Sequence, residues 1–259
     1  MPETKWLYFV VVLHGLLCCS AAAHASPDTL FRYKTNDAFG VGERLDFSIG
    51  YGIIDAGTAR MEVQAVVHQD ERAMYRIVST AHSNRVFDSF YKVRDTMVTW
   101  VDAEGLFSWR FEKHQREGDY QRDQVVEFRQ GAQQAISGND TADVPEYVHD
   151  VLSAFYYVRS HALDVGDTLY VPHWSEHKVY TLRVVVEGRE SVDTQAGTFD
   201  CVRVEPLLES DGLFRQQGKV TIWLTDDRLH MPVLVKSRLV VGAIKAELVA
   251  YRFGELWEE

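Results

Sequence analysis

The chain has 259 residues, of which 46% are hydrophobic, and a formal net charge of −11 at pH 7. That length suits one large domain or two small ones. The acidic balance argues against nucleic acid as a partner, because phosphate binding needs a basic surface, and it disfavours anionic lipid headgroups as a docking surface.

The first 25 residues have the features of a secretory signal peptide. Lys5 precedes an apolar run over residues 6–17, and Ala23-His24-Ala25 follows as an A-x-A cleavage site. The apolar run is shorter than the roughly 20 residues that a membrane-crossing helix needs, so we expect no transmembrane helix once the signal is removed. We predict a signal peptide over residues 1–25, one β-rich envelope domain over residues 26–259, and a periplasmic location.

The cysteines refine this prediction. Cys18 and Cys19 follow large residues instead of the small ones that lipidation sites prefer, so lipid anchoring is a minor alternative. Cys201 is then the one cysteine of the mature chain, which excludes an internal disulfide. Its alternating apolar surroundings indicate a buried thiol that packs as a small hydrophobic side chain.

Period-two alternation of apolar and polar residues dominates the mature chain. Leu45, Phe47 and Ile49, for example, share one face of a segment whose other face is polar. Such alternation is typical of half-buried antiparallel strands. The pattern predicts about 12 strands, over residues 45–51, 59–67, 74–81, 96–101, 106–111, 120–128, 168–172, 179–187, 198–205, 219–224, 232–241 and 244–253.

One segment breaks this alternation. Over residues 145–163 the apolar side chains recur at intervals of three and four, which is the spacing of a helix. Pro145 suits its first turn, or Asp150 caps a shorter helix through its side chain. The polar residues 139–144 before it are predicted to form a loop. No fixed repeat relates the two halves, which argues against a propeller or a solenoid, and we expect one domain with the helix packed across an open sheet.

Two motifs resemble catalytic motifs, but a structural role explains each of them better. The segment His173-Trp174-Ser175-Glu176-His177 matches H-x-x-E-H, a zinc-protease spacing when it lies on a helix. Positions i and i+4 of a strand lie about 13 Å apart, too far to ligate one ion. Ser153 lies between His149 and His161 on the predicted helix, but without a nucleophile-turn signature, and we interpret the histidines as a partly exposed polar stripe. We assign no catalytic residue, metal or cofactor.

Aromatic residues are more suggestive of a binding site. An aromatic platform with a nearby arginine can bind a sugar or an acyl chain, although a sheet also needs large side chains for its core. The candidate binding residues are Tyr91, Arg94, Asp95, Tyr156, Arg159 and Trp223.

Several short sequence motifs, taken together, resemble those of a known protein family. They are GERLDF at 42–47, IDAGTA at 54–59, FYKVRD at 90–95, DVLSAFYYVR at 150–159, GRE at 188–190, GTF at 197–199, WLTDD at 223–227 and GAIKAEL at 242–248. The set resembles domain of unknown function 3108, a family of exported bacterial proteins. The resemblance implies a periplasmic, all-β antiparallel fold with a strongly curved open sheet or barrel-like sandwich. It implies no established activity and no catalytic residues.

Three functions remain open. The first is non-catalytic binding of an envelope glycan, lipid or protein partner, which predicts a sizeable apolar or aromatic pocket. The second is an envelope hydrolase acting on glycan or lipid, which predicts titratable groups that converge on one cavity. The third is a structural or assembly factor, which predicts an unprotected edge strand or an exposed apolar patch.

Overall fold

The computed structural model describes residues 31–52, 54–69, 71–209, 219–238 and 243–257. The strands are β1 (Arg44–Tyr51), β2 (Ile54–Gln69), β3 (Arg72–Ser83), β4 (Arg94–Asp102), β5 (Ser108–Glu117), β6 (Tyr120–Arg129), β7 (Gln134–Ser137), β8 (Asp140–Asp143), β9 (Thr168–Ser175), β10 (Lys178–Thr194), β11 (Gly197–Glu209), β12 (Val220–Thr225), β13 (Pro232–Arg238) and β14 (Ala243–Arg252). The helices are α1 (Val151–Arg159) and the short 3-10 turns η1 (Phe87–Ser89) and η2 (Gln130–Ala132). The predicted signal peptide lies outside the described residues and stays a prediction.

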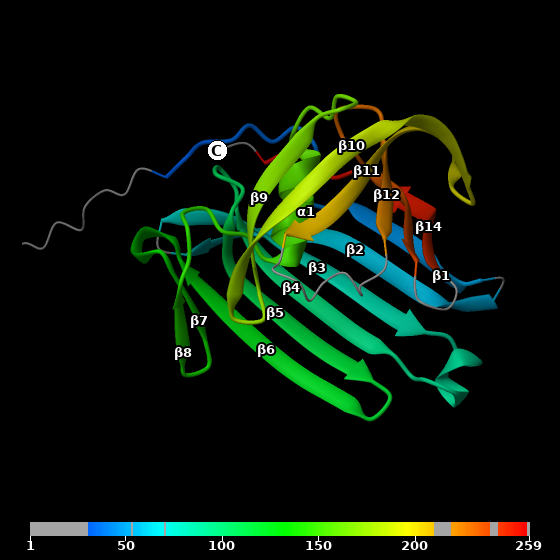
Figure 1. The fold of residues 1–259 in the computed structure, drawn as a ribbon, viewed down its shortest axis with the longest axis horizontal. Helices are drawn as coiled ribbons and strands as arrows, with labels where there is room; N and C mark the ends of the chain where they lie inside the picture. Colours follow the sequence, from blue (N-terminus) through cyan, green and yellow to red (C-terminus); the bar gives the residue numbers. More distant parts are fainter. Residues whose placement is uncertain (1–30, 53, 70, 210–218, 239–242, 258–259) are drawn as a thin grey trace, which may run out of the picture. The chain divides into compact units, whose positions relative to one another are not determined.

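Within these ranges, fourteen strands form one antiparallel sheet in the order β8-β7-β6-β5-β4-β3-β2-β1-β14-β13-β12-β11-β10-β9 (Figure 1). The order follows the chain except where β1 pairs with β14. All connections from an odd to an even strand therefore lie at one rim of the sheet, which we call rim A. The connections from an even to an odd strand lie at the opposite rim, rim B. The predicted antiparallel all-β class is confirmed.

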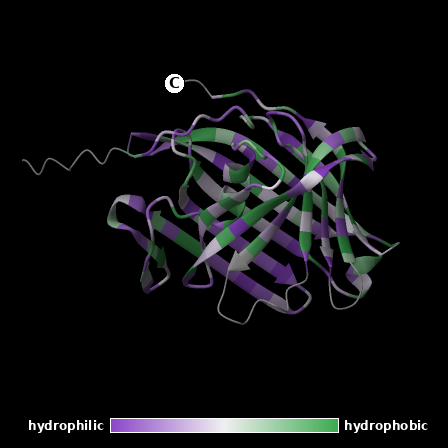
Figure 2. Ribbon diagram, turned by 45° about the horizontal axis from the view of Figure 1, so that its top comes forward, coloured by the Kyte–Doolittle hydropathy of each residue, from purple (hydrophilic) through white to green (hydrophobic). Residues whose placement is uncertain are grey.

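Alternation along the strands explains why this sheet forms. Leu45 and Phe47 of β1 are buried, whereas Asp46 between them receives ion pairs from Arg44 and Arg60 on the other face. Figure 2 shows the same alternation as green and purple bands along the strands. Most strands thus bury one face and leave the other polar, which fixes the register of their pairing.

The two strands that the sequence pattern misses are β7 and β8. Residues 140–143, predicted to be part of a loop, form β8 and pair with β7. Short edge strands often carry charges that discourage pairing with other chains. β8 has that composition, with an aspartate at each end, and therefore lacks the apolar alternation that reveals the other strands.

The helix is shorter than the predicted span of 145–163. It begins at Val151, and the side chain of Asp150 accepts hydrogen bonds from the backbone N–H groups of Leu152 and Ser153. The alternative of a shorter helix capped by Asp150 is therefore correct, and Pro145 lies outside the helix. In the described part of the chain, no helix is long and apolar enough to cross a membrane.

The sheet curls until its two ends approach each other. Phe128 of β6 meets Trp174 of β9 with ring centroids 5.9 Å apart, and Arg122 pairs with Glu176 at 2.9 Å. His149 fills the remaining gap: its N–H donates to the carbonyl of Pro172, and its carbonyl accepts from Trp174 N–H. The strongly curved open sheet is confirmed, and side chains and one bridging segment hold its ends together.

Candidate functional site

A cavity of about 430 Å³ lies between α1 and strands β9 to β12. Its walls are formed by Val151, Phe155, Val158, His173, Leu182, Val184, Val204, Pro206, Leu207, Lys219, Val220, Ile222 and Leu224. All of these are apolar except His173 and Lys219. The volume falls within the roughly 300–1,000 Å³ that small-molecule sites occupy.

The periodicities of helix and strand bring these side chains together. Val151, Phe155 and Val158 follow each other at intervals of four and three, so they form one stripe along α1. On β12, Ile222 and Leu224 face the cavity. Trp223 between them faces the other side of the sheet, because successive side chains of a strand alternate.

The cavity is closed at one end and accessible at the other. Val158 and Leu224 are buried, whereas Val151 is half exposed and the Lys219 side chain is 44% exposed. Lys219 and Val220 stand at the start of β12, and Leu207 stands near the end of β11. The accessible end therefore lies toward rim A.

Charges at the accessible end are balanced. Lys219 Nζ lies 3.1 Å from Glu187 and 2.5 Å from Glu205, and Arg203 pairs with Glu187 at 3.0 Å. Side-chain hydrogen bonds with Glu205, and to a smaller extent with Lys219, lower the pKa of Glu187 below its ordinary 4.5. Two cations thus face two carboxylates, and this end of the cavity favours neither sign of ligand charge.

His173 supplies one polar position in the cavity wall. Its side chain is buried, and Nδ1 has no hydrogen-bond partner. Burial lowers the pKa of His173 below the ordinary 6.5, against the opposing effect of Asp150. The ring is therefore neutral at pH 7 and is a polar group in an otherwise apolar part of the wall.

A buried polar layer lies behind the helix start. The Asp150 carboxylate accepts hydrogen bonds from Thr99 Oγ1 at 2.7 Å and Ser108 Oγ at 2.5 Å. The guanidinium of Arg32 lies 3.3 Å from His149 Nε2, so Nε2 must accept, and Nδ1–H then donates to Ser153 Oγ at 3.3 Å. His149 is thus not arranged to take the proton of Ser153, which a serine hydrolase requires of its histidine.

The histidine interpretation from sequence is wrong for His149. Its side chain is fully buried instead of forming part of an exposed stripe. Burial and the neighbouring Arg32 hold the pKa of His149 well below its ordinary 6.5. The sequence spacing correctly predicted one helix face, but not what covers that face.

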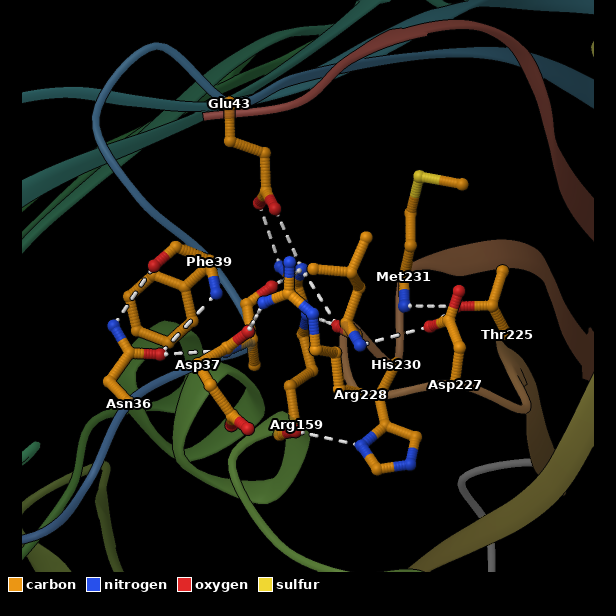
Figure 3. A network of polar contacts seen from close by, with 12 residues as sticks. Asn36, Asp37, Phe39, Glu43, Arg159, Thr225, Asp227, Arg228, His230 and Met231 are labelled. Atoms are coloured by element: carbon orange, nitrogen blue, oxygen red, sulfur yellow. Dashed lines mark hydrogen bonds and ion pairs between the residues drawn. The ribbon is translucent and has the colours of Figure 1, made fainter. Parts of the chain in front are cut away.

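Arg159 and Tyr156, two of the predicted binding residues, are fully buried. Figure 3 shows the side chains of Arg159 and Glu43 pointing toward each other. Arg159 pairs with Glu43 through two contacts of 2.8 and 2.7 Å and donates to the carbonyls of Ala38 and Leu229. Its guanidinium also lies 4.9 Å from the ring centroid of Tyr156. Burial opposes its charge, but Glu43 raises the pKa of Arg159. These side chains join the end of α1 to the chain before β1 and to the β12–β13 turn.

Tyr91, Arg94 and Asp95 lie together at rim A, in and next to the β3–β4 connection. Arg94 pairs with Asp88 at 2.6 Å, and hydrogen bonds from Arg94 and Ser83 lower the pKa of Asp88 to about 2. Asp95 accepts from the backbone N–H of Arg116 at 2.8 Å.

Trp223 stands apart from the other predicted residues. Its Nε1–H donates to Glu190 at 2.8 Å, and Lys236 lies 5.0 Å from its ring centroid. The six predicted residues therefore occupy three separate places, and none of them lines the cavity. In the H-x-x-E-H motif, His173 is on β9, whereas Glu176 and His177 form the turn after it.

Sequence reasoning did not identify the cavity. Most of its lining residues belong to segments that were correctly predicted as strands and helix, and His173, Pro206 and Leu207 lie just beyond the predicted strands 168–172 and 198–205. Alternation indicates which side chains point inward, but it does not reveal that α1 leaves space between itself and the sheet.

Comparison with known proteins gives a family match and several structural matches. The model of DUF3108, described as a protein of unknown function, matches residues 46–249, in agreement with the resemblance of the motifs. No curated protein matches the sequence. A β-barrel-like protein of the domain of unknown function DUF1849 from Brucella abortus has a similar fold, with a TM-score of 0.59 at 12% identity over 84% of this chain and 99% of that one.

Two further solved structures match less well. A candidate lipoprotein from Parabacteroides distasonis has a TM-score of 0.40 at 12% identity, covering 85% of this chain and 100% of its own. A candidate exported protein with a YmcC-like fold from Bacteroides fragilis has a TM-score of 0.31 at 13% identity, covering 86% and 100%.

Proposed function

The chain belongs to the DUF3108 family of proteins of unknown function, and from its site we propose that it binds the hydrocarbon chain of a lipid without catalysis. The observation that carries this proposal is the cavity between α1 and β9–β12, whose wall is apolar except for His173 and Lys219. Each methylene group that such a wall takes out of water contributes about 0.8 kcal/mol to binding.

A hydrocarbon chain fits this wall better than a glycan does. The hydroxyl groups of a sugar would lose their hydrogen bonds to water, and an unpaired buried hydroxyl costs about 1–3 kcal/mol. Among the described lining residues, His173 is the one buried polar side chain. The wall therefore suits a long apolar chain better than a ligand with several polar groups.

The alternative of an envelope hydrolase has less support. Among the described residues that line the cavity, only His173 and Lys219 have titratable side chains, and Lys219 forms ion pairs with two carboxylates. We further propose that the protein acts in the periplasm. The predicted signal peptide over residues 1–25 supports that location.

Binding of a fluorescent long-chain fatty acid to the purified protein tests the proposal. Val220→Trp would place a large ring at the accessible end of the cavity, and we expect it to weaken binding at least tenfold. Thr221→Trp is the matched control, because Thr221 is adjacent on β12 and faces the other side of the sheet. We expect that variant to bind within about twofold of wild type.

Thermal unfolding followed by circular dichroism would show that both variants fold. The proposal would be wrong if the wild-type protein bound no fatty acid, or if Val220→Trp bound it as tightly as wild type. Native mass spectrometry of protein isolated from the envelope would add the mass of a co-purifying lipid.

A further inference from the structure

Four large apolar side chains protrude into solvent where two neighbouring hairpins end. Phe90 is 84% exposed and Val86 is 66% exposed, both in the β3–β4 connection. Tyr91 and Tyr120 beside them are 45% and 49% exposed. Single exposed apolar residues are ordinary, but a group of them marks an interaction site. We call Val86, Phe90, Tyr91 and Tyr120 the apolar tip.

The two hairpin ends are in contact (Figure 1). Gly118 N–H donates to the carbonyl of Lys92 at 2.8 Å, and Val93 forms a β-bridge with Glu117. The ring of Tyr91 packs so closely on Gly118 that a Cβ there would lie 3.0 Å from it. The apolar tip is therefore one continuous structure at rim A.

Hydrogen bonds hold the β3–β4 connection in this conformation. The side chain of Asn84 accepts from Val86 N–H and Phe87 N–H, and Ser89 Oγ donates to the carbonyl of Val86. At the base of the connection, Arg94 donates to both carboxylate oxygens of Asp88. The connection thus keeps Phe90 in solvent instead of letting it fold back against the sheet.

The charge beside the tip is close to balanced, unlike that of the whole chain. Arg85 and Lys92 are exposed beside the apolar residues, and Arg94 balances Asp88. Glu117 and Asp119 of the second hairpin end carry two negative charges. Aromatic rings with adjacent Lys or Arg suit the headgroup layer of a bilayer, where rings enter the interface and cations meet phosphates. A net charge of −11 works against a strongly anionic surface, so a neutral phospholipid surface fits better.

We propose that the apolar tip docks on the interfacial layer of a neutral phospholipid bilayer. Four side chains at the ends of two neighbouring hairpins suit shallow insertion better than they suit a protein interface, which buries about 800 Å² per partner. Rim A also carries the accessible end of the cavity, so docking turns that end toward the lipid. The inference goes beyond the proposed function, because it rests on surface residues and not on the cavity.

Flotation of the purified protein with vesicles of phosphatidylcholine and phosphatidylethanolamine tests the proposal. We expect wild type to float with the vesicles and Phe90→Ser to lower the partition coefficient about tenfold, because it removes the largest inserted apolar surface. Tyr33→Ser is the matched control. Tyr33 is 78% exposed, and its neighbour Lys34 bonds to Glu104 in the β4–β5 connection at rim B. We expect this variant to float as wild type does.

A fluorescent label gives a second measurement that does not depend on the loss of binding. A solvent-sensitive dye attached to Ser89→Cys reports on the tip alone, because Cys201 is buried and burial raises the pKa of its thiol to about 12. We expect a blue shift when vesicles are added. The same dye on Tyr33→Cys should show no shift.

The outcomes separate this inference from the proposed function. Val220→Trp should float normally even if it no longer binds fatty acid. The inference is overturned if the wild-type protein does not float with the vesicles. That result would leave the tip as a surface for a protein partner. It is also overturned if Phe90→Ser and Tyr33→Ser float equally well.

Discussion

At the residue scale, the feature with the largest free-energy cost is the charge of Arg159, which is buried in the protein interior. An isolated buried cation is costly, and a partner compensates for it only with good geometry and further hydrogen bonds. Arg159 has both, since Glu43 meets it with two oxygens and two carbonyls take its other donors (Figure 3). Arg159, one of the predicted binding residues, joins three parts of the chain.

Arg159→Met tests this role. The substitution keeps much of the side-chain volume but leaves the Glu43 carboxylate buried without its partner. We expect the free energy of unfolding in urea to fall by about 3–5 kcal/mol. The double variant Glu43→Gln/Arg159→Met should recover part of that loss, because it removes the unpaired charge. A loss below about 1 kcal/mol for the single variant would contradict the role.

At the element scale, α1 depends on its surroundings. Nine residues are too few for a helix to be stable alone in water, so packing and capping must hold it. Leu152 and Tyr156 pack into one core cluster, and Ala154 and Val158 pack into another. Asp150 fixes the helix start, because one carboxylate oxygen caps the helix and the other accepts from two hydroxyls of the sheet.

Two substitutions at position 150 separate these contributions. Asp150→Ala removes the cap and leaves Thr99 and Ser108 without their acceptor, and we expect it to lower the free energy of unfolding by about 2–4 kcal/mol. Asp150→Asn keeps an oxygen for the cap, and the two hydroxyls can turn to accept from its NH₂ group. It should therefore cost less than half as much in the same urea titration. Equal losses would show that the cap contributes little.

At the scale of the whole molecule, the curled sheet encloses histidines along with its apolar core. His149, His161 and His173 all lie near α1, and burial lowers the pKa of each below 6.5. The folded protein therefore binds fewer protons than the unfolded chain at mildly acidic pH. Their contribution to stability is complete above pH 6.5 and is lost as the pH falls below it.

The free energy of unfolding should consequently fall as the pH is lowered from 7.5 to 5.5. For His149, which is fully buried, we expect the free energy of unfolding to fall by up to about 1.4 kcal/mol per pH unit below 6.5. Urea titrations at several pH values would measure this slope. His149→Asn can still accept from Arg32 and donate to Ser153, but it does not titrate, so its slope should be smaller. If His149→Asn has the same slope as wild type, groups other than His149 cause the pH dependence of stability.

The sequence by itself determined what depends on local patterning. Alternation predicted twelve of the fourteen strands and their antiparallel class, and the three-and-four spacing located the helix. These features can be predicted from the sequence because a strand or helix that contributes to the core must bury one face, whichever element it packs against. Short polar strands such as β8 were missed because they bury almost nothing.

Only the tertiary structure decided which residues meet. Tyr156 and Arg159 were predicted at a binding site, but the chain around Ala38 and Glu43 folds over them and buries them. Val184, Val204 and Ile222 are ordinary core residues in sequence, yet they line a cavity because the short helix α1 leaves space beside the curled sheet. The pattern of a chain specifies which side chains face inward. Whether they pack together or enclose a space depends on distances between segments far apart in sequence.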